Sequence, residues 1–333
     1  MKHTFSCCLL LLVLVGLVPL VYLIPSVAGA DHALSLPEAS SAAPTPSAEE
    51  APTPEIIREP VLLCDMDTGE LLTPELKEYL VGAAAGEMPA SWPDQAILAQ
   101  MVSCHSYLLY CKAQGGCEEG GWIEVAPARM QGYLPPELRR QRWGDAYEEN
   151  EARFEALAAQ VEDALILYEG QPAAAFYHAV SQGHTEASQH VWDEALPYLQ
   201  GVESEWDKTA DGYAQSVEYT SQQLYDALVM NLGITPEGEP GEWLGATRWY
   251  DTGYVDTIEV AGQEVAGTAF RQALALRSAC FSVSYSGEVF HILTHGYGHG
   301  VGLSQWGARR MAEEGASWQE ILAHYFPGTE ISE

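Results

Sequence analysis

The chain begins with a long apolar stretch. After Lys2, residues 5–27 are almost entirely apolar, which is about the length that one membrane-spanning helix needs, roughly 20 residues. The Ala28-Gly29-Ala30 triplet that follows is the small-residue type of signal-peptidase site. We therefore expect residues 1–30 to be a transmembrane anchor or a cleaved signal sequence. Either one places the rest of the chain on the extracytoplasmic side of the cell membrane.

A polar tether follows this stretch. Residues 31–54 consist largely of Ala, Pro, Ser, Thr and Glu and contain almost no apolar run. Such a segment cannot bury a core, so we expect a disordered linker. Periodic patterns begin near Glu55 and continue to the end of the chain, which predicts one folded domain over residues 55–333.

Helical signals come first in the folded part. Thr73-Pro74 supplies an N-cap and a proline in the first turn, which predicts a helix to about Ala85. A break at residues 87–89 separates it from a second helix over residues 94–113, which ends before a Gly-Gly pair. Residues 148–162 are typical of a third helix.

Alternation of apolar and polar residues then predicts strands. Residues 164–168 and 173–177 read as a hairpin, and residues 281–285 and 289–293 read as two strands joined by a Ser-Gly turn. The other expected elements are strands at 217–219 and 255–260 and helices at 220–230, 304–314 and from 317 onward. Helices first, strands later and helices last predict an α+β fold.

Charge narrows the possible ligands. The 333 residues carry 47 acidic against 15 basic side chains, a formal net charge of -32. A nucleic-acid partner is not expected, because binding a phosphate backbone requires a concentrated basic surface. The same balance argues against electrostatic binding to anionic lipid. A carbohydrate, held by hydrogen bonds and aromatic faces, fits better.

The cysteines add one constraint. Two of the seven lie in the apolar N-terminal stretch, and the other five form an odd set, so at least one stays unpaired or pairs between chains. Cys104 and Cys111 are two helical turns apart, about 10 Å, which is beyond the disulfide limit of about 7 Å. Cys111 with Cys117 is the one local pair that we consider plausible.

Three widely separated segments carry the clearest motifs. They are residues 86–107, which contain Gly-Glu-Met-Pro-Ala; residues 176–203, which contain Ser-Gln-Gly-His-Thr-Glu; and residues 270–329, which contain GYGHGVGLSQWGA. In this order they resemble the stage II sporulation protein D family (SpoIID/LytB). The resemblance covers about residues 60–333, and three ordered matches make coincidence a poor explanation.

The resemblance implies a single domain with a substrate groove and lytic transglycosylase activity. Such enzymes cut the bond between N-acetylmuramic acid and N-acetylglucosamine in peptidoglycan and leave a 1,6-anhydro end. In the sporulation members the substrate is glycan stripped of stem peptides, and a peptidoglycan amidase is the working partner during engulfment. This chain departs from the family at Leu98 and His105, where Lys and Arg are usual. Loss of both cations should alter how their helix contacts the groove or the catalytic glutamate.

This reaction needs one carboxyl group that acts twice. Glycoside hydrolases use two carboxylates, but here the C6 hydroxyl of the sugar is the nucleophile. One carboxyl can therefore protonate the leaving oxygen and then deprotonate that hydroxyl. It must stay partly protonated near neutral pH, which requires burial. The resemblance assigns this role to Glu87, whose alternative interpretation is a solvent-exposed carboxylate at a helix end.

The loop from Gly296 to Gly302 has glycine at alternate positions, which lets backbone approach a ligand closely. It matches neither GxGxxG nor a P-loop, so nucleotide binding is not expected. The residues expected to line the glycan groove are His105, Tyr177, Ser181, His299, Ser304, Gln305 and Trp306. The alternative is a tight, buried turn in which the tryptophan serves packing.

Three histidines suggest a metal hypothesis. His178, His184 and His190 recur at a spacing of six, and neutral imidazoles are common zinc ligands. That spacing is not a helical pair, so a turn would have to bring them together. We expect no cofactor to be required, and any zinc here to be structural. The alternative leaves these side chains as structural or substrate-contacting groups.

Three functions stay open from the sequence. The first is a lytic transglycosylase with Glu87 as its acid/base. The second is a non-catalytic glycan-binding module that enhances an amidase, as the LytB-type members suggest; it should tolerate Glu87→Gln. The third is a zinc hydrolase that uses the histidines, although the sequence has no HExxH motif.

Overall fold

The computed structural model describes residues 60–117, 120–192 and 194–332. The expected anchor at 1–30 and linker at 31–54 lie outside the described residues. Among the helices of the described ranges, none is both long and apolar enough to cross a membrane.

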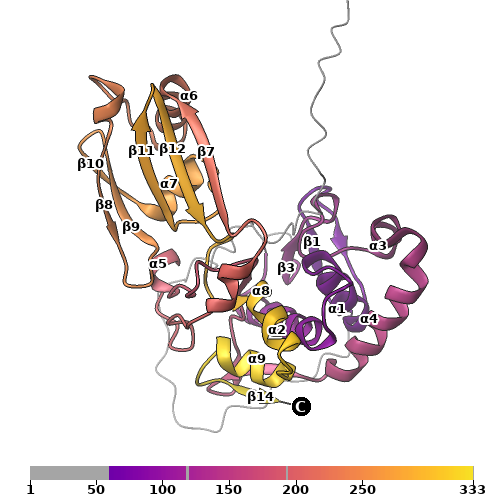
Figure 1. Cartoon of the computed structure of the whole chain (residues 1–333). Helices are drawn as coiled ribbons and strands as arrows, with labels where there is room; N and C mark the ends of the chain where they lie inside the picture. Colours follow the sequence, from indigo (N-terminus) through magenta and orange to yellow (C-terminus); the bar gives the residue numbers. More distant parts are fainter. Residues whose placement is uncertain (1–59, 118–119, 193, 333) are drawn as a thin grey trace, which may run out of the picture.

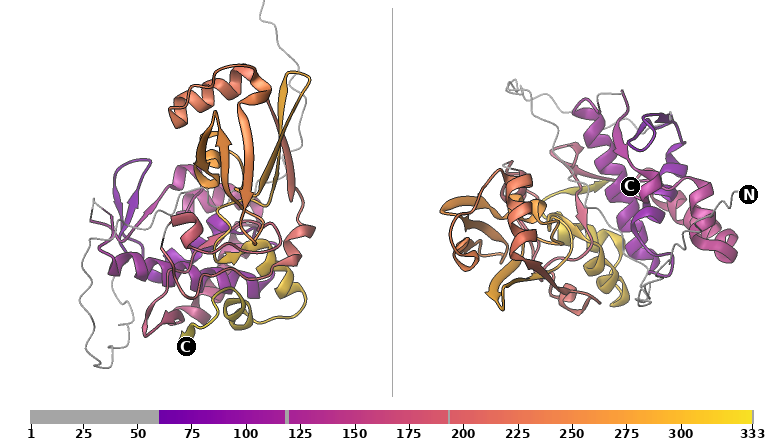
Figure 2. Two further views of the ribbon diagram at one scale, coloured as in Figure 1. Left: turned by 90° about the vertical axis from the view of Figure 1, so that its left-hand side faces the viewer. Right: turned by 90° about the horizontal axis from the view of Figure 1, so that it is seen from above.

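The described chain forms two parts, each with its own hydrophobic cluster (Figure 1). The larger part holds both ends of the described chain, and the smaller part is inserted between them. Figure 2 shows the smaller part projecting from the larger one in both further views. Helices and strands are mixed in this domain, in agreement with the sequence analysis.

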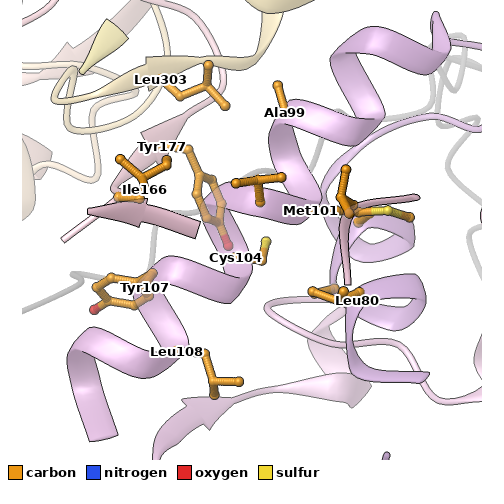
Figure 3. Close-up of a cluster of buried hydrophobic side chains, with 14 of the residues drawn as sticks. Leu80, Ala99, Met101, Cys104, Tyr107, Leu108, Ile166, Tyr177 and Leu303 are labelled. Carbon is orange, nitrogen blue, oxygen red and sulfur yellow. The ribbon is translucent and has the colours of Figure 1, made fainter. Parts of the chain in front are cut away.

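The larger part is built around α2 (Asp94–Ala113), which contacts four other helices. This helix is buried on nearly every side, and its two central serines bond within it: Ser103 and Ser106 donate to the carbonyls of Ala99 and Val102, four residues earlier. Figure 3 shows part of the cluster that surrounds it. The helices of this part are α1 (Leu76–Glu87), α3 (Pro136–Trp143), α4 (Tyr147–Val161), α5 (Gln189–Trp192), α8 (Gln305–Glu313) and α9 (Trp318–Tyr325).

The described strands of the larger part are short and form three small sheets. β1 (Leu63–Asp65) pairs with β2 (Leu71–Leu72) and, in parallel, with β3 (Ile123–Val125). A second sheet has the order β14-β4-β5, with β14 at Glu330–Ser332, β4 at Leu165–Tyr168 and β5 at Gln171–Pro172. A two-residue parallel pair joins β6 (Tyr177–His178) to β13 (Leu303–Ser304), which brings the second and third sequence motifs together.

The smaller part, residues 214–295, is called the inserted lobe here. Its sheets have the orders β11-β12-β7 and β10-β9-β8. The chain leaves and re-enters the larger part at neighbouring points, because the Gly296 amide donates to the Tyr213 carbonyl at 2.8 Å. Its elements are β7 (Ala214–Thr220), α6 (Ser221–Ala227), β8 (Leu244–Trp249), β9 (Val255–Val260), β10 (Gln263–Ala266), α7 (Gly267–Ala273), β11 (Phe281–Ser286) and β12 (Val289–His295).

Two expected elements differ from the structure. In the expected hairpin of residues 164–168 and 173–177, β4 pairs instead with β5 at Gln171–Pro172, because the amides of Ala175 and Phe176 donate to carbonyls two residues earlier and not to β4. The helix expected to reach residue 230 ends as an α-helix at Ala227 and continues as a π-helical turn, Leu228–Leu232.

The expected pairing of Cys111 with Cys117 is wrong. Cys117 forms a disulfide with Cys64, because the parallel pairing of β1 with β3 brings the segment before β3 against β1. Spacing along the chain cannot reveal this contact between distant segments. Cys104, Cys111 and Cys280 are free thiols, so the expected unpaired cysteine is present.

Candidate active site

Glu87 is the last residue of α1, and the sequence explains why the helix stops there. A residue that precedes proline is disfavoured in the helical conformation, and Met88, which precedes Pro89, is extended (φ -124°, ψ 142°). The carboxyl group of Glu87 is buried, with 3% of the residue exposed. The C-terminal end of a helix carries partial negative charge, which disfavours a second negative charge beside it.

Few donors reach this carboxyl group. The Gly132 amide donates to Oε1 at 3.1 Å, and Nε2 of Gln305 donates to Oε2 at 3.3 Å. Arg142 lies close by and donates to the carbonyl of Gly86 at 3.2 Å. These groups come from three distant segments, so the tertiary fold assembles the surroundings of Glu87.

Burial raises the pKa of Glu87 from 4.5 to about 7. The hydrogen bonds from Gly132 and Gln305 and the charge of Arg142 lower it, but by less than burial raises it. A carboxyl group with this pKa is present as both acid and base near neutral pH, which is the condition for general acid–base work.

The neighbours of Glu87 on its inner side are neutral. Burial raises the pKa of the Cys104 thiol to about 12 and that of the Tyr177 hydroxyl well above its ordinary value. Figure 3 shows Tyr177 reaching from β6 with its hydroxyl end toward Cys104 on α2. Both groups stay protonated at neutral pH, so this side of Glu87 adds polarity without charge.

Gln305 links Glu87 to the central helix. Its Nε2 atom also donates to Oε1 of Gln100 at 3.3 Å, and Gln100 in turn donates to the sulfur of Cys104. Gln305 is the first residue of α8 and has no exposed surface. The glycan contact expected of Gln305 stays a prediction; in this structure its side chain contacts Glu87.

Trp306 is the expected groove residue that retains exposed surface. Its ring meets Trp92 edge-on at 6.2 Å, and the Arg309 guanidinium lies over the ring at 4.6 Å. Its Nε1 donates to the Thr209 hydroxyl at 3.2 Å. A partly exposed indole, fixed on three sides and one residue beyond Gln305, is suited to contact a sugar face.

The other expected groove residues lie inside the protein. They are His105, Tyr177, Ser181, His299 and Ser304, each at most 7% exposed. Burial keeps them from an open groove in this structure, and the Nε2 atoms of His105 and His299 are buried there without a hydrogen-bond partner among the described residues. Nδ1 of His105 lies 3.2 Å from the Ala164 carbonyl, and burial lowers the pKa of His105 to about 4. The imidazole is therefore neutral at neutral pH.

The glycine loop is a tight, buried turn, as the alternative interpretation held. A side chain at Gly302, where φ is 75°, would place a Cβ 2.2 Å from the Phe176 carbonyl. At Gly298, where φ is 111°, it would meet Cβ of His178 at 2.8 Å. Glycine is required here by close packing against the 176–186 segment.

The structure does not bring the three candidate zinc ligands together. Nδ1 of His178 faces the Val301 carbonyl, Nδ1 of His184 faces the Thr185 carbonyl, and Nδ1 of His190 bonds Glu186 at 2.8 Å. In the part of the chain that the structure describes, no group of three His, Cys, Asp or Glu side chains is arranged to hold a metal. The three histidines therefore do not form a zinc site in the described part of the chain.

Several residues of the site were not found from the sequence. Gly132 and Arg142 follow Glu87 by 45 and 55 positions in segments without a motif, and nothing local points to them. Asp207 was also missed. It is fully buried in a short helical turn, Glu205–Thr209, where it accepts from the Ser181 amide at 2.9 Å and the Ser304 hydroxyl at 2.8 Å.

A hollow of about 460 Å³ lies beside the loop that supplies Gly132. Its walls are mostly apolar, and Glu87 is not among the residues that line it. They are Asp65, Leu71, Leu72, Thr73, Pro74, Glu78, Pro127, Tyr133, Pro135 and Pro136.

The sequence is similar to proteins of one known family. The family model of the stage II sporulation protein matches residues 67–225. Stage II sporulation protein D of Bacillus subtilis (strain 168) is 30% identical over 262 residues, which span 78% of this chain and 74% of that protein. The chain belongs to the stage II sporulation protein D family. The protein of the same name from Bacillus amyloliquefaciens is also 30% identical, with the same coverage.

A more distant relative of this family member has a different name. The amidase enhancer of Bacillus subtilis (strain 168) is 24% identical over 304 residues, which span 76% of this chain and 40% of that protein. This chain is thus similar to two proteins named for sporulation and, at lower identity, to one named amidase enhancer.

Proposed function

We propose that this protein is a lytic transglycosylase that cleaves the bond between N-acetylmuramic acid and N-acetylglucosamine in peptide-stripped peptidoglycan strands. The observation that carries the proposal is the buried carboxyl group of Glu87, whose pKa burial raises to about 7. A surface carboxylate could not protonate a glycosidic oxygen at neutral pH, whereas this group holds a proton over much of that range.

In the proposed reaction Glu87 acts first as an acid. Its proton passes to the glycosidic oxygen while the bond from that oxygen to C1 of the muramic acid breaks. The carboxylate that remains then takes the proton of the C6 hydroxyl as that oxygen bonds to C1. The product is a 1,6-anhydro end, and Glu87 has regained its proton. No water and no second carboxylate take part, and Glu87 lies near the neutral Tyr177 and Cys104 and the positive charge of Arg142.

Each partner of Glu87 has a role in this cycle. The amide of Gly132 and the side chain of Gln305 each donate to one carboxylate oxygen, so they stabilise the charged form that arises in the middle of the cycle. Trp306, which directly follows Gln305, supplies the partly exposed aromatic face for the sugar.

The setting of the activity is part of the proposal. We place the domain on the extracytoplasmic side of the cell membrane, anchored or exported through residues 1–30, in sporulation and engulfment. A peptidoglycan amidase that strips the stem peptides is the proposed partner, since the relative named amidase enhancer associates this family with an amidase.

That relative also favours a second candidate function, a glycan-binding module that enhances an amidase without cleaving glycan. The two functions differ in what they require of Glu87. A binding module needs no proton transfer, so it should work as well with glutamine at this position.

The test compares the full-length protein with its Glu87→Gln variant on peptide-free glycan strands, with products read by mass spectrometry. We expect 1,6-anhydro-muramic ends from the wild type and none from Glu87→Gln. Glu162→Gln is the matched control, because Glu162 directly follows the last residue of α4 and is partly exposed; it should cleave as the wild type does.

Other products would lead to other conclusions. Reducing ends in place of anhydro ends would mean hydrolysis, and the single-carboxyl mechanism would be wrong. Strands that both proteins bind and neither cleaves would favour the amidase-enhancing module.

A further inference from the structure

The start of α8 differs from the start of the neighbouring α9, although both are capped by serine. At α9 the hydroxyl of Ser317 accepts from the Glu320 amide at 3.3 Å and donates to the Glu320 carboxylate at 2.8 Å. The same carboxylate accepts from the Ser317 amide at 2.8 Å, which completes a capping box in which the helix supplies its own carboxylate. Its position depends on no distant residue.

At α8 the serine hydroxyl donates to a carboxylate from elsewhere in the chain. The Ser304 hydroxyl accepts from the Gly307 amide at 3.2 Å and donates to Asp207 at 2.8 Å, across 97 positions of sequence. Residue 307 cannot supply the carboxylate itself, because a Cβ there would lie 1.9 Å from the Tyr325 hydroxyl oxygen. The first turn of α8 is therefore tied to Asp207.

Asp207 also holds the segment that faces this turn. Its other carboxylate oxygen accepts from the Ser181 amide at 2.9 Å, and the Trp306 amide donates to the Ala179 carbonyl at 3.1 Å. One buried carboxylate thus joins the 179–181 segment to the start of α8. A buried carboxylate is costly unless it is hydrogen-bonded, and here its bonds all lead to these two elements and to Ser204.

The next residue after the cap is Gln305, whose side chain donates to Glu87 at 3.3 Å. We propose that Asp207, through the hydroxyl of Ser304, is a positioning residue that holds Gln305 against Glu87. Asp207 touches neither Glu87 nor substrate in this proposal. It fixes the start of α8, where the Gln305 side chain donates to Glu87. The inference rests on the proposed role of Glu87.

The test compares Asp207→Asn and Ser304→Ala with Ser317→Ala in the full-length protein. Each of these variants disturbs one serine cap, so each should lower the unfolding midpoint. Only Asp207→Asn and Ser304→Ala should change the pKa of Glu87. Its carboxylate would lose a donor, so its pKa should rise by about one pH unit, because a hydrogen bond to a charged group contributes about that much. Arg142 and the Gly132 amide remain in place in all three variants.

Two readouts report that shift. The alkaline limb of kcat/KM on glycan strands should move up by about one unit in Asp207→Asn and Ser304→Ala and stay in place in Ser317→Ala. The carboxyl stretching band in the infrared spectrum, assigned to Glu87 by its loss in Glu87→Gln, should titrate with the same shift. The infrared readout requires no activity, so it still tests the positioning role if the protein proves not to cleave glycan.

The proposal fails if Asp207→Asn and Ser304→Ala lower the unfolding midpoint as Ser317→Ala does while the titration of Glu87 stays as in the wild type. Asp207 would then be a structural residue of the turn alone. If Asp207→Asn does not fold, Ser304→Ala decides, since it removes a single hydroxyl group and leaves the carboxylate with the Ser181 amide.

Discussion

Replacing Glu87 by glutamine should make the protein more stable at alkaline pH and leave it nearly unchanged at acidic pH. Burial raises the pKa of this carboxyl from 4.5 to about 7. Between those values the folded protein binds a proton that the unfolded chain releases, so the stability that this group contributes is present below pH 4.5 and lost as pH rises to 7. At about 1.4 kcal/mol per unit, the wild type loses about 3 kcal/mol over this interval through Glu87 alone.

The assay is urea unfolding of wild type and Glu87→Gln, followed by tryptophan fluorescence at pH 4.5 and pH 8.5. Other titrating groups cancel because the two proteins are compared at each pH. Any packing or hydrogen-bond change caused by the amide also cancels, since it is the same at both pH values. We expect the difference in unfolding free energy to move by about 3 kcal/mol in favour of the variant at pH 8.5. An equal difference at both pH values would show that Glu87 titrates as in water, and the proposed acid would be untenable.

Three further predictions concern the frame around the site. Arg139 is fully buried between two carboxylates. Arg139→Leu should therefore lower the unfolding free energy, measured in urea, by about 3–5 kcal/mol. A loss below about 1 kcal/mol would show that the carboxylates relax into water. Cys64→Ser removes the disulfide to Cys117 across 53 positions; the unfolding free energy should fall by about 4 kcal/mol, and addition of reductant should lower the melting temperature of the wild type but not of the variant. Because burial lowers the pKa of His105 from 6.5 to about 4, its contribution to stability is present above pH 6.5 and lost as pH falls to 4. His105→Asn should reduce that acid-side loss by about 3 kcal/mol in urea titrations, and an unchanged slope would contradict the burial of this imidazole.

The sequence predicted those parts of the fold that local chemistry decides. The second helix has the expected bounds, Asp94–Ala113, because the signals at both of its ends are local. A break at residues 87–89 was also expected, since Met88-Pro89 cannot continue a helix, although α1 runs on to Glu87. The two-residue strands β6 and β13 were missed, because they are too short for any alternation to show.

The site was predicted only in part, for a similar reason. The motifs identified Glu87, Gln305 and Trp306, and the structure does bring Gln305 to Glu87. They did not show that Gln305 is buried, nor that Gly132 would donate to the other oxygen. A donor that is a backbone amide in a segment without a motif leaves no trace in residue type.

The inserted lobe bears on how this protein can change over time. Its two ends are held together by the hydrogen bond between Gly296 and Tyr213, and its hydrophobic cluster is separate from that of the larger part. Hydrogen bonds such as that from Thr252 to Glu186 also link the two parts, but residues 214–295 otherwise resemble a domain inserted into the larger part. Such an insertion can lengthen, shorten or acquire a new surface while its junction stays closed. The chemistry at Glu87 and the surface of the inserted lobe can therefore diverge under separate selection.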